Sequence, residues 1–233
     1  DWQRAVVEDA PCADAMLAEI ASRYRAGDWE GVLEGVRQSH ARYPDQRIPH
    51  FVATAVLHRL DRTDDERRAM GIYLRGYGEA SAYLIPWATS VSLLAVGLPE
   101  LSLTALRHGA VLAERVDSGQ RHKMANSYRL AGDRMQQLGH LAQAVESYRL
   151  AVGIAPQAAT YVELGMALYA QGRVGESSAA YRRGIELAPE DAVARINYGW
   201  NLYLEGQLAA AADQFRRALA LGSHSAAAFN LGL

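Results

Sequence analysis

The sequence predicts an all-α protein built from stacked pairs of antiparallel helices. Its 233 residues are 50% hydrophobic but only 8% aromatic. The hydrophobic half is dominated by alanine and leucine, and this composition favours packed helices over sheets. The second observation is a motif that recurs at intervals of 33 or 34 residues. Together they indicate a repeat protein in which each repeat is one helix pair that must stack on its neighbours to bury its apolar face.

One aromatic position carries the repeat most clearly, because Tyr148, Tyr181 and Phe215 are 33 and 34 residues apart. Small residues stand four residues before and three residues after each aromatic residue, and a glycine stands nine residues before. These flanking residues are Ala144, Ser177 and Ala211, then Ala151, Gly184 and Ala218, then the glycines Gly139, Gly172 and Gly206. A second glycine series has the same spacing, at Gly132, Gly165, Gly199 and Gly232. Chance does not keep two such series in phase over three periods.

Each period has the features of two helices joined by a tight turn. The apolar stripe of a first helix, at i, i+3, i+4 and i+7, is formed by Tyr161, Leu164, Gly165 and Leu168. Gly172 has the conformational freedom for the turn, and Pro189 ends the second helix. Small residues on one face of that helix allow close approach, while an aromatic ring fills the gap between the helices. We therefore expect the four motif aromatics to be buried, namely Tyr148, Tyr161, Tyr181 and Phe215.

The motif resembles the tetratricopeptide repeat over residues 125–233. Three segments match the family's pattern: Tyr161-x2-Leu164-Gly165, Ser177-x3-Tyr181 and Pro189. The next unit departs from the pattern, because Arg195 takes the aromatic position and Ser223 takes the proline position. The resemblance implies a right-handed superhelical solenoid whose first helices line the concave side.

Weaker copies of the motif precede residue 125. Gly27 and Gly97 take the turn position, and Ala69-x3-Tyr73-x2-Gly76 reproduces the second helix. In that pair we expect a lengthened turn at 61–64, with a capping box formed by Thr63 and Glu66.

Other upstream signals concern where helices begin and end. Pro99 is expected in the first turn of a helix, and Pro86 is expected to kink or delay its helix. Residues 115–124 are the expected irregular junction. The sequence thus predicts a single solenoid over residues 1–233. Its repeats are expected at 13–46, 47–82, 83–116, 125–157, 158–191 and 192–224, with the start of a further repeat at 225–233.

The first helices of the clearest repeats have a second face beside the apolar stripe. At i, i+4 and i+7 this face carries Arg129, Asp133 and Gln136 in one repeat, Val162, Met166 and Tyr169 in the next, and Ile196, Trp200 and Tyr203 in the third. Asn197 and Asn230 lie beside it, 33 residues apart, and their amides can bond an extended peptide backbone. Two interpretations stay open: a binding groove with aromatic anchors, or packing between neighbouring first helices.

The leading functional prediction is a non-catalytic protein–protein interaction module that binds a peptide or partner protein in this groove. The expected contact residues are Trp200, Tyr203, Asn197, Met166, Tyr169, Asn230, Asn126, Arg129 and Asp133. Some members of the family hold a partner's terminal carboxylate with Lys, Arg and Asn on successive first helices. The apolar residues here disfavour such a clamp. A polar alternative is an acidic partner bound by Arg25, Arg59, Asn126 and Arg129.

Charge and composition argue against several other classes of protein. The formal net charge is -2 and Lys123 is the only lysine, so nucleic acid is not an expected partner. The sequence also contains no phosphate-binding loop of the G-x-x-x-x-G-K-[ST] type. Asp213 is placed to pair with Arg217 four residues later. No apolar run reaches the length that spans a bilayer, and Cys12 is the single cysteine. We expect a soluble chain, cytoplasmic or periplasmic, with no disulfide and no membrane insertion.

Catalytic signals are lacking. The seven histidines form no H-E-x-x-H motif, and no G-x-S-x-G elbow occurs. His50 and His58 are expected to be surface or capping residues, so we predict no metal, no cofactor and no catalytic residue.

Two alternatives come from other classes. The first alternative to the interaction module is the substrate-presenting arm of a larger enzyme, such as a glycosyltransferase. The second is a self-associating scaffold of a bacterial secretion or export assembly. Both rest on the end at Leu233, which interrupts a first helix and leaves the solenoid without a polar cap. That end leads us to expect a truncated chain, with possible self-association through the uncapped carboxyl-terminal helix.

Overall fold

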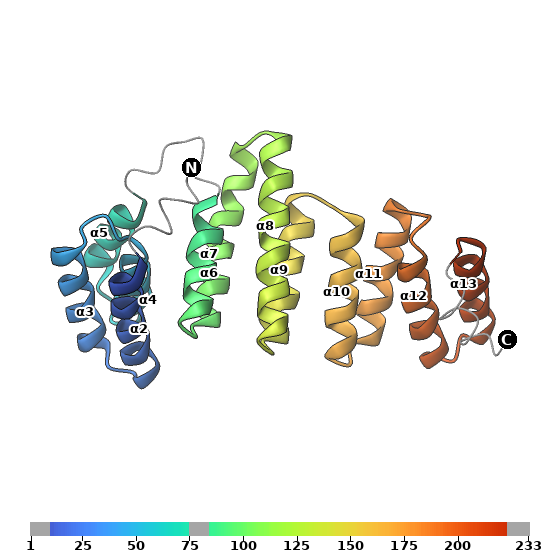
Figure 1. Cartoon of the computed structure of the whole chain (residues 1–233), viewed down its shortest axis with the longest axis horizontal. Helices are drawn as coiled ribbons and strands as arrows, with labels where there is room; N and C mark the ends of the chain where they lie inside the picture. Colours follow the sequence, from blue (N-terminus) through green and yellow to red (C-terminus); the bar gives the residue numbers. More distant parts are fainter. Residues whose placement is uncertain (1–9, 75–83, 223–233) are drawn as a thin grey trace. The chain divides into compact units, whose positions relative to one another are not determined.

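The structure, a computed structural model, describes residues 10–74 and 84–222, with side chains from residue 15 onward. Within these ranges the chain forms the α-helices α2 to α13 and one short 3₁₀ helix, and it contains no strand (Figure 1). The all-α prediction is therefore confirmed. The chain divides into two compact units, residues 1–105 and 106–233, which are described separately below. The single solenoid over the whole chain stays a prediction.

The described part of the first unit, residues 10–74 and 84–105, contains five complete helices and the start of a sixth. They are α2 (Ala10–Ala26), α3 (Trp29–Arg42), α4 (Ile48–Arg59), α5 (Thr63–Leu74), α6 (Ile85–Ala95) and the first part of α7 (Pro99–Ala110). α4 packs against α2, α3 and α5, so it is buried nearly all round. Pro86 lies in the first turn of α6 and Pro99 begins α7, so both prolines start helices, as a missing N–H at that position allows.

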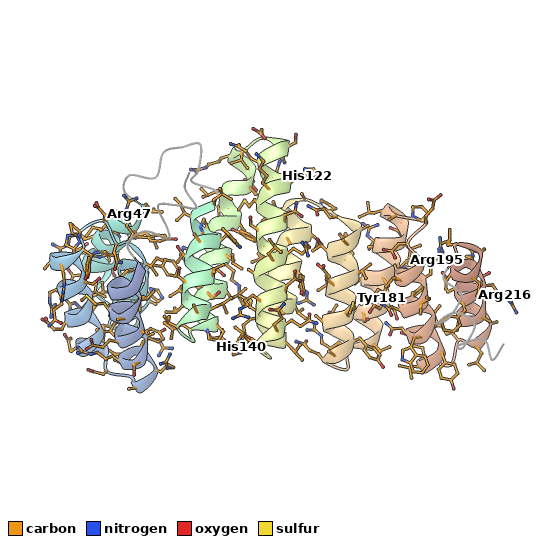
Figure 2. The ribbon with its side chains drawn as sticks, viewed as in Figure 1. Arg47, His122, His140, Tyr181, Arg195 and Arg216 are labelled. Atoms are coloured by element: carbon orange, nitrogen blue, oxygen red, sulfur yellow. The ribbon has the colours of Figure 1, made fainter. Side chains whose placement is uncertain are left out.

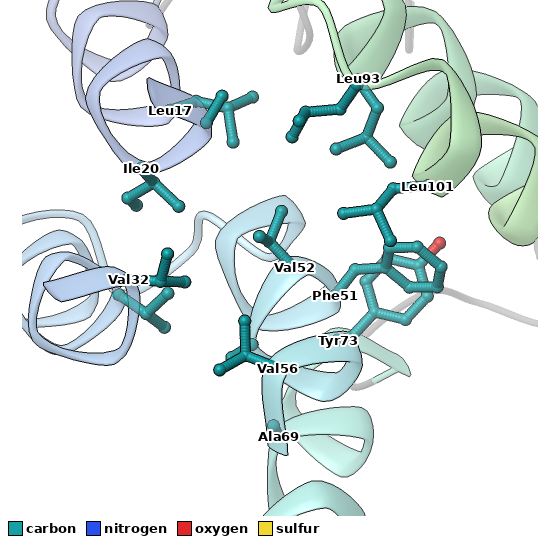
Figure 3. Packing of buried hydrophobic residues seen from close by; sticks show 14 of the residues in the cluster. Leu17, Ile20, Val32, Phe51, Val52, Val56, Ala69, Tyr73, Leu93 and Leu101 are labelled. Atoms are coloured by element: carbon teal, nitrogen blue, oxygen red, sulfur yellow. The ribbon is translucent and has the colours of Figure 1, made fainter. Parts of the chain in front are cut away.

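A single apolar cluster holds this first unit together. Side chains from all its helices converge there, and most of them are branched aliphatic residues (Figure 3). Ile20, Val32, Val52 and Leu93 are almost fully buried within it. The predicted second-helix residues Ala69 and Tyr73 are buried there too. The ring of Tyr73 lies 5.0 Å from that of Phe51, and its hydroxyl is 2.8 Å from Thr89 Oγ1 of α6.

Up to residue 222, the second unit continues from the end of α7 with three consecutive helix pairs. Its elements are the 3₁₀ helix η2 (Val111–Arg115), then α8 (Ser118–Gln137) with α9 (Leu141–Ile154), α10 (Ala158–Ala170) with α11 (Val174–Leu187), and α12 (Ala192–Leu204) with α13 (Leu208–Ala220). From α8 to α13 each helix packs on the next, as the ribbon shows (Figure 1). Each pair is antiparallel, because only three residues join its two helices.

The irregular junction lies earlier than the sequence indicates. The chain leaves the helical path at η2 and at the extended Val116, and α8 then begins at Ser118. Asp117 caps this helix, since its carboxylate accepts a hydrogen bond from Gln120 N while Gln120 bonds the Asp117 N–H. The capping box expected at Thr63 and Glu66 is not what the structure has there, because Thr63 is already the first residue of α5.

The turns within the pairs share one geometry. At Gly172 (φ 73°) the glycine N–H bonds Tyr169 O at 2.8 Å, and the N–H of Arg173 bonds Leu168 O at 3.0 Å. Both bonds satisfy carbonyl groups at the end of the helix, as in the Schellman motif. Gly27, Gly97, Gly139 and Gly206 also have positive φ, between 75° and 81°. The predicted turn glycines are thus confirmed.

The turn between α4 and α5 corrects one prediction. It is not lengthened, because Leu60, Asp61 and Arg62 join the helices with the same bonds as the glycine turns. Arg62 N bonds Leu57 O at 2.9 Å, and Asp61 takes the glycine position with φ 55°. Aspartate adopts this left-handed conformation more readily than most residues do. No glycine marks this turn in the sequence, so the spacing of the glycines does not predict it.

A glycine beneath an aromatic ring sets the closest approach within each pair of the second unit. A Cβ added at Gly165 would lie 2.6 Å from the Tyr181 ring. The same relation holds at 2.7 Å for Gly132 and Tyr148, and at 2.6 Å for Gly199 and Phe215. Real Cβ atoms do not approach rings this closely, so the ring lies flat against the bare helix backbone. We call this arrangement the glycine–aromatic contact.

Three of the four motif aromatics are buried as predicted, and Tyr161 is not. Tyr148, Tyr181 and Phe215 are at most 3% exposed, whereas Tyr161 is half-buried at the edge of α10. Arg195, labelled in Figure 2, takes the equivalent position of α12. It is 9% exposed and so more buried than Tyr161. Its guanidinium donates to Pro189 O at 2.6 and 3.0 Å and to Gln214 Oε1 at 3.2 Å. An arginine is accommodated there because its donors find partners.

One buried polar chain links three helices of the second unit. Asn201 of α12 is 1% exposed and donates from Nδ2 to Ser177 Oγ of α11 at 2.8 Å. The Ser177 hydroxyl in turn donates to Gly165 O of α10 at 2.7 Å. Ser177 thus acts as donor and acceptor at once, and the contact satisfies groups that burial would otherwise penalise.

Candidate functional site

The candidate site is the solvent-exposed face of the first helices α8, α10 and α12 in the second unit. Four large apolar side chains there remain exposed: Met166 (46%), Tyr169 (40%), Trp200 (39%) and Tyr203 (51%). We call these four residues the aromatic patch. Such side chains ordinarily favour burial, and clusters of them on a surface commonly mark places where other molecules bind.

Trp200 joins the two helices of the aromatic patch. Its ring stacks on Tyr203, one turn further along α12, with centroids 5.4 Å apart and planes 23° apart. Its indole N–H donates to the Tyr169 hydroxyl of α10 at 3.0 Å. Trp200 therefore touches a neighbouring first helix and still presents more than a third of its surface to solvent. The two interpretations of this residue, groove and packing, are both represented in its contacts.

Beside the aromatic patch lies an open hollow of about 450 Å³ between α8, α9 and α10. It is lined by Asp133, Gln136, Gln137, Tyr148, Glu163 and Met166. We call it the carboxylate hollow. Arg129 NH1 lies 3.0 Å from Asp133 Oδ2 and 2.8 Å from Glu163 Oε1, so one guanidinium is shared by two carboxylates. The Tyr148 hydroxyl donates to Asp133 Oδ1 at 2.7 Å.

The carboxylate hollow has more acidic than basic side chains, with two carboxylates and one guanidinium. Burial raises the pKa of the Glu163 carboxyl, and the negative charge of Asp133 raises it further, against the opposing effect of Arg129. Burial and the bond to Asp133 likewise raise the pKa of the Tyr148 hydroxyl. Glu163 Oε2 is shielded from solvent and accepts no hydrogen bond. A buried acceptor without a donor is costly, so this oxygen is unusual.

The two described asparagines of the predicted site lie on different helices. Asn197 is half-buried on α12 and Asn126 is exposed on α8, while Asn230 lies outside the described residues. The sequence analysis did not consider Asn201, which is the buried asparagine of α12. It also missed Glu163, although Glu163 stands 34 residues after Arg129, one repeat further along the same face. Charges of opposite sign one repeat apart were the signal that could have identified this pair.

The arginines that were predicted to bind an acidic partner already have partners within the chain. Arg129 is held by two carboxylates, as described above. In the first unit, Arg25 donates to Val96 O, and the Arg59 guanidinium lies 5.2 Å from the centre of the Trp29 ring. Arg217 pairs with Asp213 at 2.9 Å, as predicted.

The histidine prediction is wrong at His50. His50 is only 7% exposed, and its Nε2 lies 3.2 Å from His40 Nδ1. Burial, together with His40, lowers its pKa from 6.5 to about 4. The reason is that α4 is covered on nearly all sides, so it has no polar face for a histidine. His58 lies at the surface, as expected, 3.3 Å from Glu66 Oε2.

Other clusters in the described ranges offer no comparable site. A hollow of about 510 Å³ at the α4–α5 turn is lined by charged residues. Its arginines Arg62, Arg67 and Arg68 pair with Asp64 and Asp65 nearby in sequence. Across residues 10–74 and 84–222, no three His, Cys, Asp or Glu side chains are grouped to hold a metal ion. No helix in the same ranges is both long and apolar enough to cross a bilayer.

Comparison with known proteins agrees with the repeat geometry. The family model of the tetratricopeptide repeat matches residues 135–157 and 158–191. Among solved structures, MamA is 19% identical, covers 74% of this chain and 96% of its own length, and gives a TM-score of 0.46. YrrB, described as a TPR protein with an unusual peptide-binding site, is 14% identical over 85% and 98% of the two chains, with a TM-score of 0.47.

A third similar structure is the TPR2AB domain of yeast Sti1 in a pHSP90 complex. It is 14% identical, covers 95% of this chain and 99% of its own, and has a TM-score of 0.41. No curated protein matches the sequence.

The stacked helix pairs and the glycine–aromatic contacts define a class, the helical repeat proteins. Within that class, residues 135–191 match the tetratricopeptide repeat over two consecutive repeats.

Proposed function

We propose that this chain binds an extended segment of a partner protein across the face of α8, α10 and α12, without catalysing a reaction. The observation that carries the proposal is the aromatic patch, in which Trp200 and Tyr203 stack on each other and remain exposed. Tryptophan and tyrosine dominate binding energy where a partner covers them, because each buries a large apolar area at a small cost in side-chain entropy.

The patch is also preorganised. Trp200 is fixed from two sides, by the Tyr203 ring and by the hydrogen bond to Tyr169. A side chain already held in place loses little freedom when a partner binds, so more of the contact energy appears as affinity. The amide of Asn197, on the same helix, is proposed to bond the partner's backbone, and Asn126, Asn230, Arg129 and Asp133 are proposed to extend the surface.

The test is selection from a library of random linear peptides displayed against the folded chain. The peptides that bind are then measured by fluorescence polarisation against the wild type and the Trp200→Ala, Tyr203→Ala variant. We expect the double variant to bind at least about thirtyfold more weakly, since a central anchor contributes about 2 kcal/mol or more.

A matched control removes exposed apolar side chains from the second helices. Leu187 of α11 and Leu208 of α13 are each more than half exposed, so the Leu187→Ala, Leu208→Ala variant should bind normally. Circular dichroism should show that both variants keep the helical content of the wild type. Equal binding by the wild type and the Trp200→Ala, Tyr203→Ala variant would refute the proposal.

The two alternative functions depend on residues from 223 onward, which lie outside the described residues. Neither the enzyme arm nor the self-associating scaffold is favoured by an observation in the described ranges.

A further inference from the structure

The carboxylate hollow adjoins the aromatic patch and shares Met166 with it. Along α10, Glu163 faces the hollow, Met166 lies one turn further on, and Tyr169 follows at the patch. The two features thus form one continuous strip on the same unit. What occupies the hollow is a question that rests on the proposed function, because it concerns the chemistry of the same partner.

The charges of the strip favour a cation. Two carboxylates, Asp133 and Glu163, face a single guanidinium, that of Arg129. The remaining polar side chains that line the hollow, Gln136, Gln137 and Tyr148, carry no charge at neutral pH. Arg129 is engaged with both carboxylates, so a partner's carboxylate would meet two like charges and no available cation. A lysine or arginine side chain of the partner would instead meet two carboxylates that are neutralised by only one guanidinium.

The hydrogen-bonding capacity of the strip points the same way. Each carboxylate oxygen can accept more than one bond, and Glu163 Oε2 accepts none. Glu163 lines the hollow, and the terminal torsion of a glutamate is soft, so its carboxylate can reorient towards a ligand there. An ammonium or guanidinium there would supply the missing donor and balance the second carboxylate in charge-assisted bonds.

We infer that the partner segment carries a lysine or arginine whose charged group enters the carboxylate hollow, while an apolar residue of the same segment covers the aromatic patch. The spacing follows from the helices. Glu163 and Tyr169 are about 9 Å apart along α10, and neighbouring helices lie about 9 Å apart. The diagonal of about 13 Å corresponds to about four residues of extended chain.

The peptide library described above tests this inference through the sequences it enriches. We expect the selected peptides to share a lysine or arginine about four residues from an aromatic or aliphatic residue. Each selected peptide is then synthesised with its basic residue and with glutamine in that place. Both versions are measured against the wild type, Glu163→Gln and Glu190→Gln.

Glu163→Gln keeps an oxygen that can accept from Arg129 and removes the negative charge. We expect it to bind the basic peptide about tenfold more weakly, as for the loss of one charge-assisted bond, and to bind the glutamine peptide as the wild type does. Glu190→Gln removes an exposed carboxylate elsewhere in the same unit and should change neither affinity.

The outcomes separate the two proposals. If enriched peptides lack a basic residue, are acidic, or lose the same affinity to Glu163→Gln in both versions, the inference is overturned while binding at the aromatic patch stands. An unchanged affinity of the basic peptide for Glu163→Gln overturns it as well. A library that yields no peptide dependent on Trp200 and Tyr203 overturns the proposed function, and the inference fails with it.

Discussion

In the second unit, the bare backbone at the closest approach of each pair belongs to the first helix, and an aromatic ring from the second helix covers it. In the first pair of the first unit the two roles are exchanged. Gly35 lies on the second helix α3, and a Cβ there would stand 2.9 Å from Ile20 Cγ1 of the first helix α2. The two units thus achieve close packing with different residues on opposite helices.

The next pair of the first unit departs further. The offset that separates Gly165 from Tyr181 leads from Tyr73 back to Leu57, a buried leucine. With a leucine side chain in place of bare backbone, the Tyr73 ring lies against Phe51 and its hydroxyl reaches Thr89. A flat ring on a glycine requires both residues at fixed positions, whereas aliphatic side chains can interlock in many ways. This explains why the motif is strict in one unit and degenerate in the other.

The largest expected difference between the units is in folding stability at acid pH, where the first unit should be weakened. The pKa of His50 is about 4 in the folded chain against 6.5 normally, so the unfolded chain binds more protons between these values. Stability present above pH 6.5 is therefore lost as the pH falls towards 4, by up to about 3 kcal/mol. Urea unfolding at several pH values measures the loss, and hydrogen exchange should locate it in α3 and α4.

The control for this prediction is His50→Phe, which keeps a ring of similar size beside His40. It should remove most of the acid dependence between pH 6.5 and 4. If the variant loses stability in acid as steeply as the wild type, His50 is not the responsible group.

The second prediction breaks the glycine–aromatic contact of the second unit. Gly165→Ala places a methyl group 2.6 Å from the Tyr181 ring, and we expect a loss of about 2 kcal/mol from overpacking. Gly153→Ala is the matched change in the same unit, because nothing lies within 4 Å of its added Cβ. That variant should gain about 0.5–1 kcal/mol from helix propensity. Thermal unfolding that moves both variants in one direction would contradict the assigned role of Gly165.

The prediction with the smallest expected effect places a glycine in a turn of the first unit, as in the turns of the second unit. Asp61→Gly relieves a non-glycine residue at φ 55° but also gives the unfolded chain more freedom. We expect a net gain of about 0.5 kcal/mol in urea unfolding. Asp61→Ala, which keeps the unfavourable backbone and removes the carboxylate, should instead lose stability. A loss in the glycine variant would mean that the Asp61 side chain itself contributes.

The sequence predicted the fold wherever the constraint is local. The turns at Gly172 and Gly206 need a residue with positive φ, and glycine adopts that conformation most readily. The sequence therefore identifies their positions. The burial of His50 and the partial exposure of Tyr161 depend instead on how many helices cover their own helix, and no local pattern records that. Arg195 shows the same limit, because one of its partners, Gln214 of α13, meets it only through the packing of α12 against that helix.

For the site, periodicity could predict which residues share a face but not which of them touch. Met166, Tyr169, Trp200 and Tyr203 follow from the spacing, and the structure places them exposed on neighbouring helices. Their role in binding remains a prediction. The bond from Trp200 to Tyr169 and the sharing of Arg129 between Asp133 and Glu163 depend on the distance between helices. A sequence pattern does not contain that distance.

The polar chain from Asn201 through Ser177 to Gly165 has a consequence for how such a protein can grow or shrink during evolution. The position of Ser177 is occupied by Ala144 in the preceding repeat. Deleting the pair α10–α11 would set Asn201 opposite that alanine, with its amide buried and unbonded at a cost of about 1–3 kcal/mol. Duplicating the pair α12–α13 would carry the same penalty, because the second copy of Asn201 would face Ala211. The modules look interchangeable by their period, yet a single hydroxyl fixes the order in which these two can be joined.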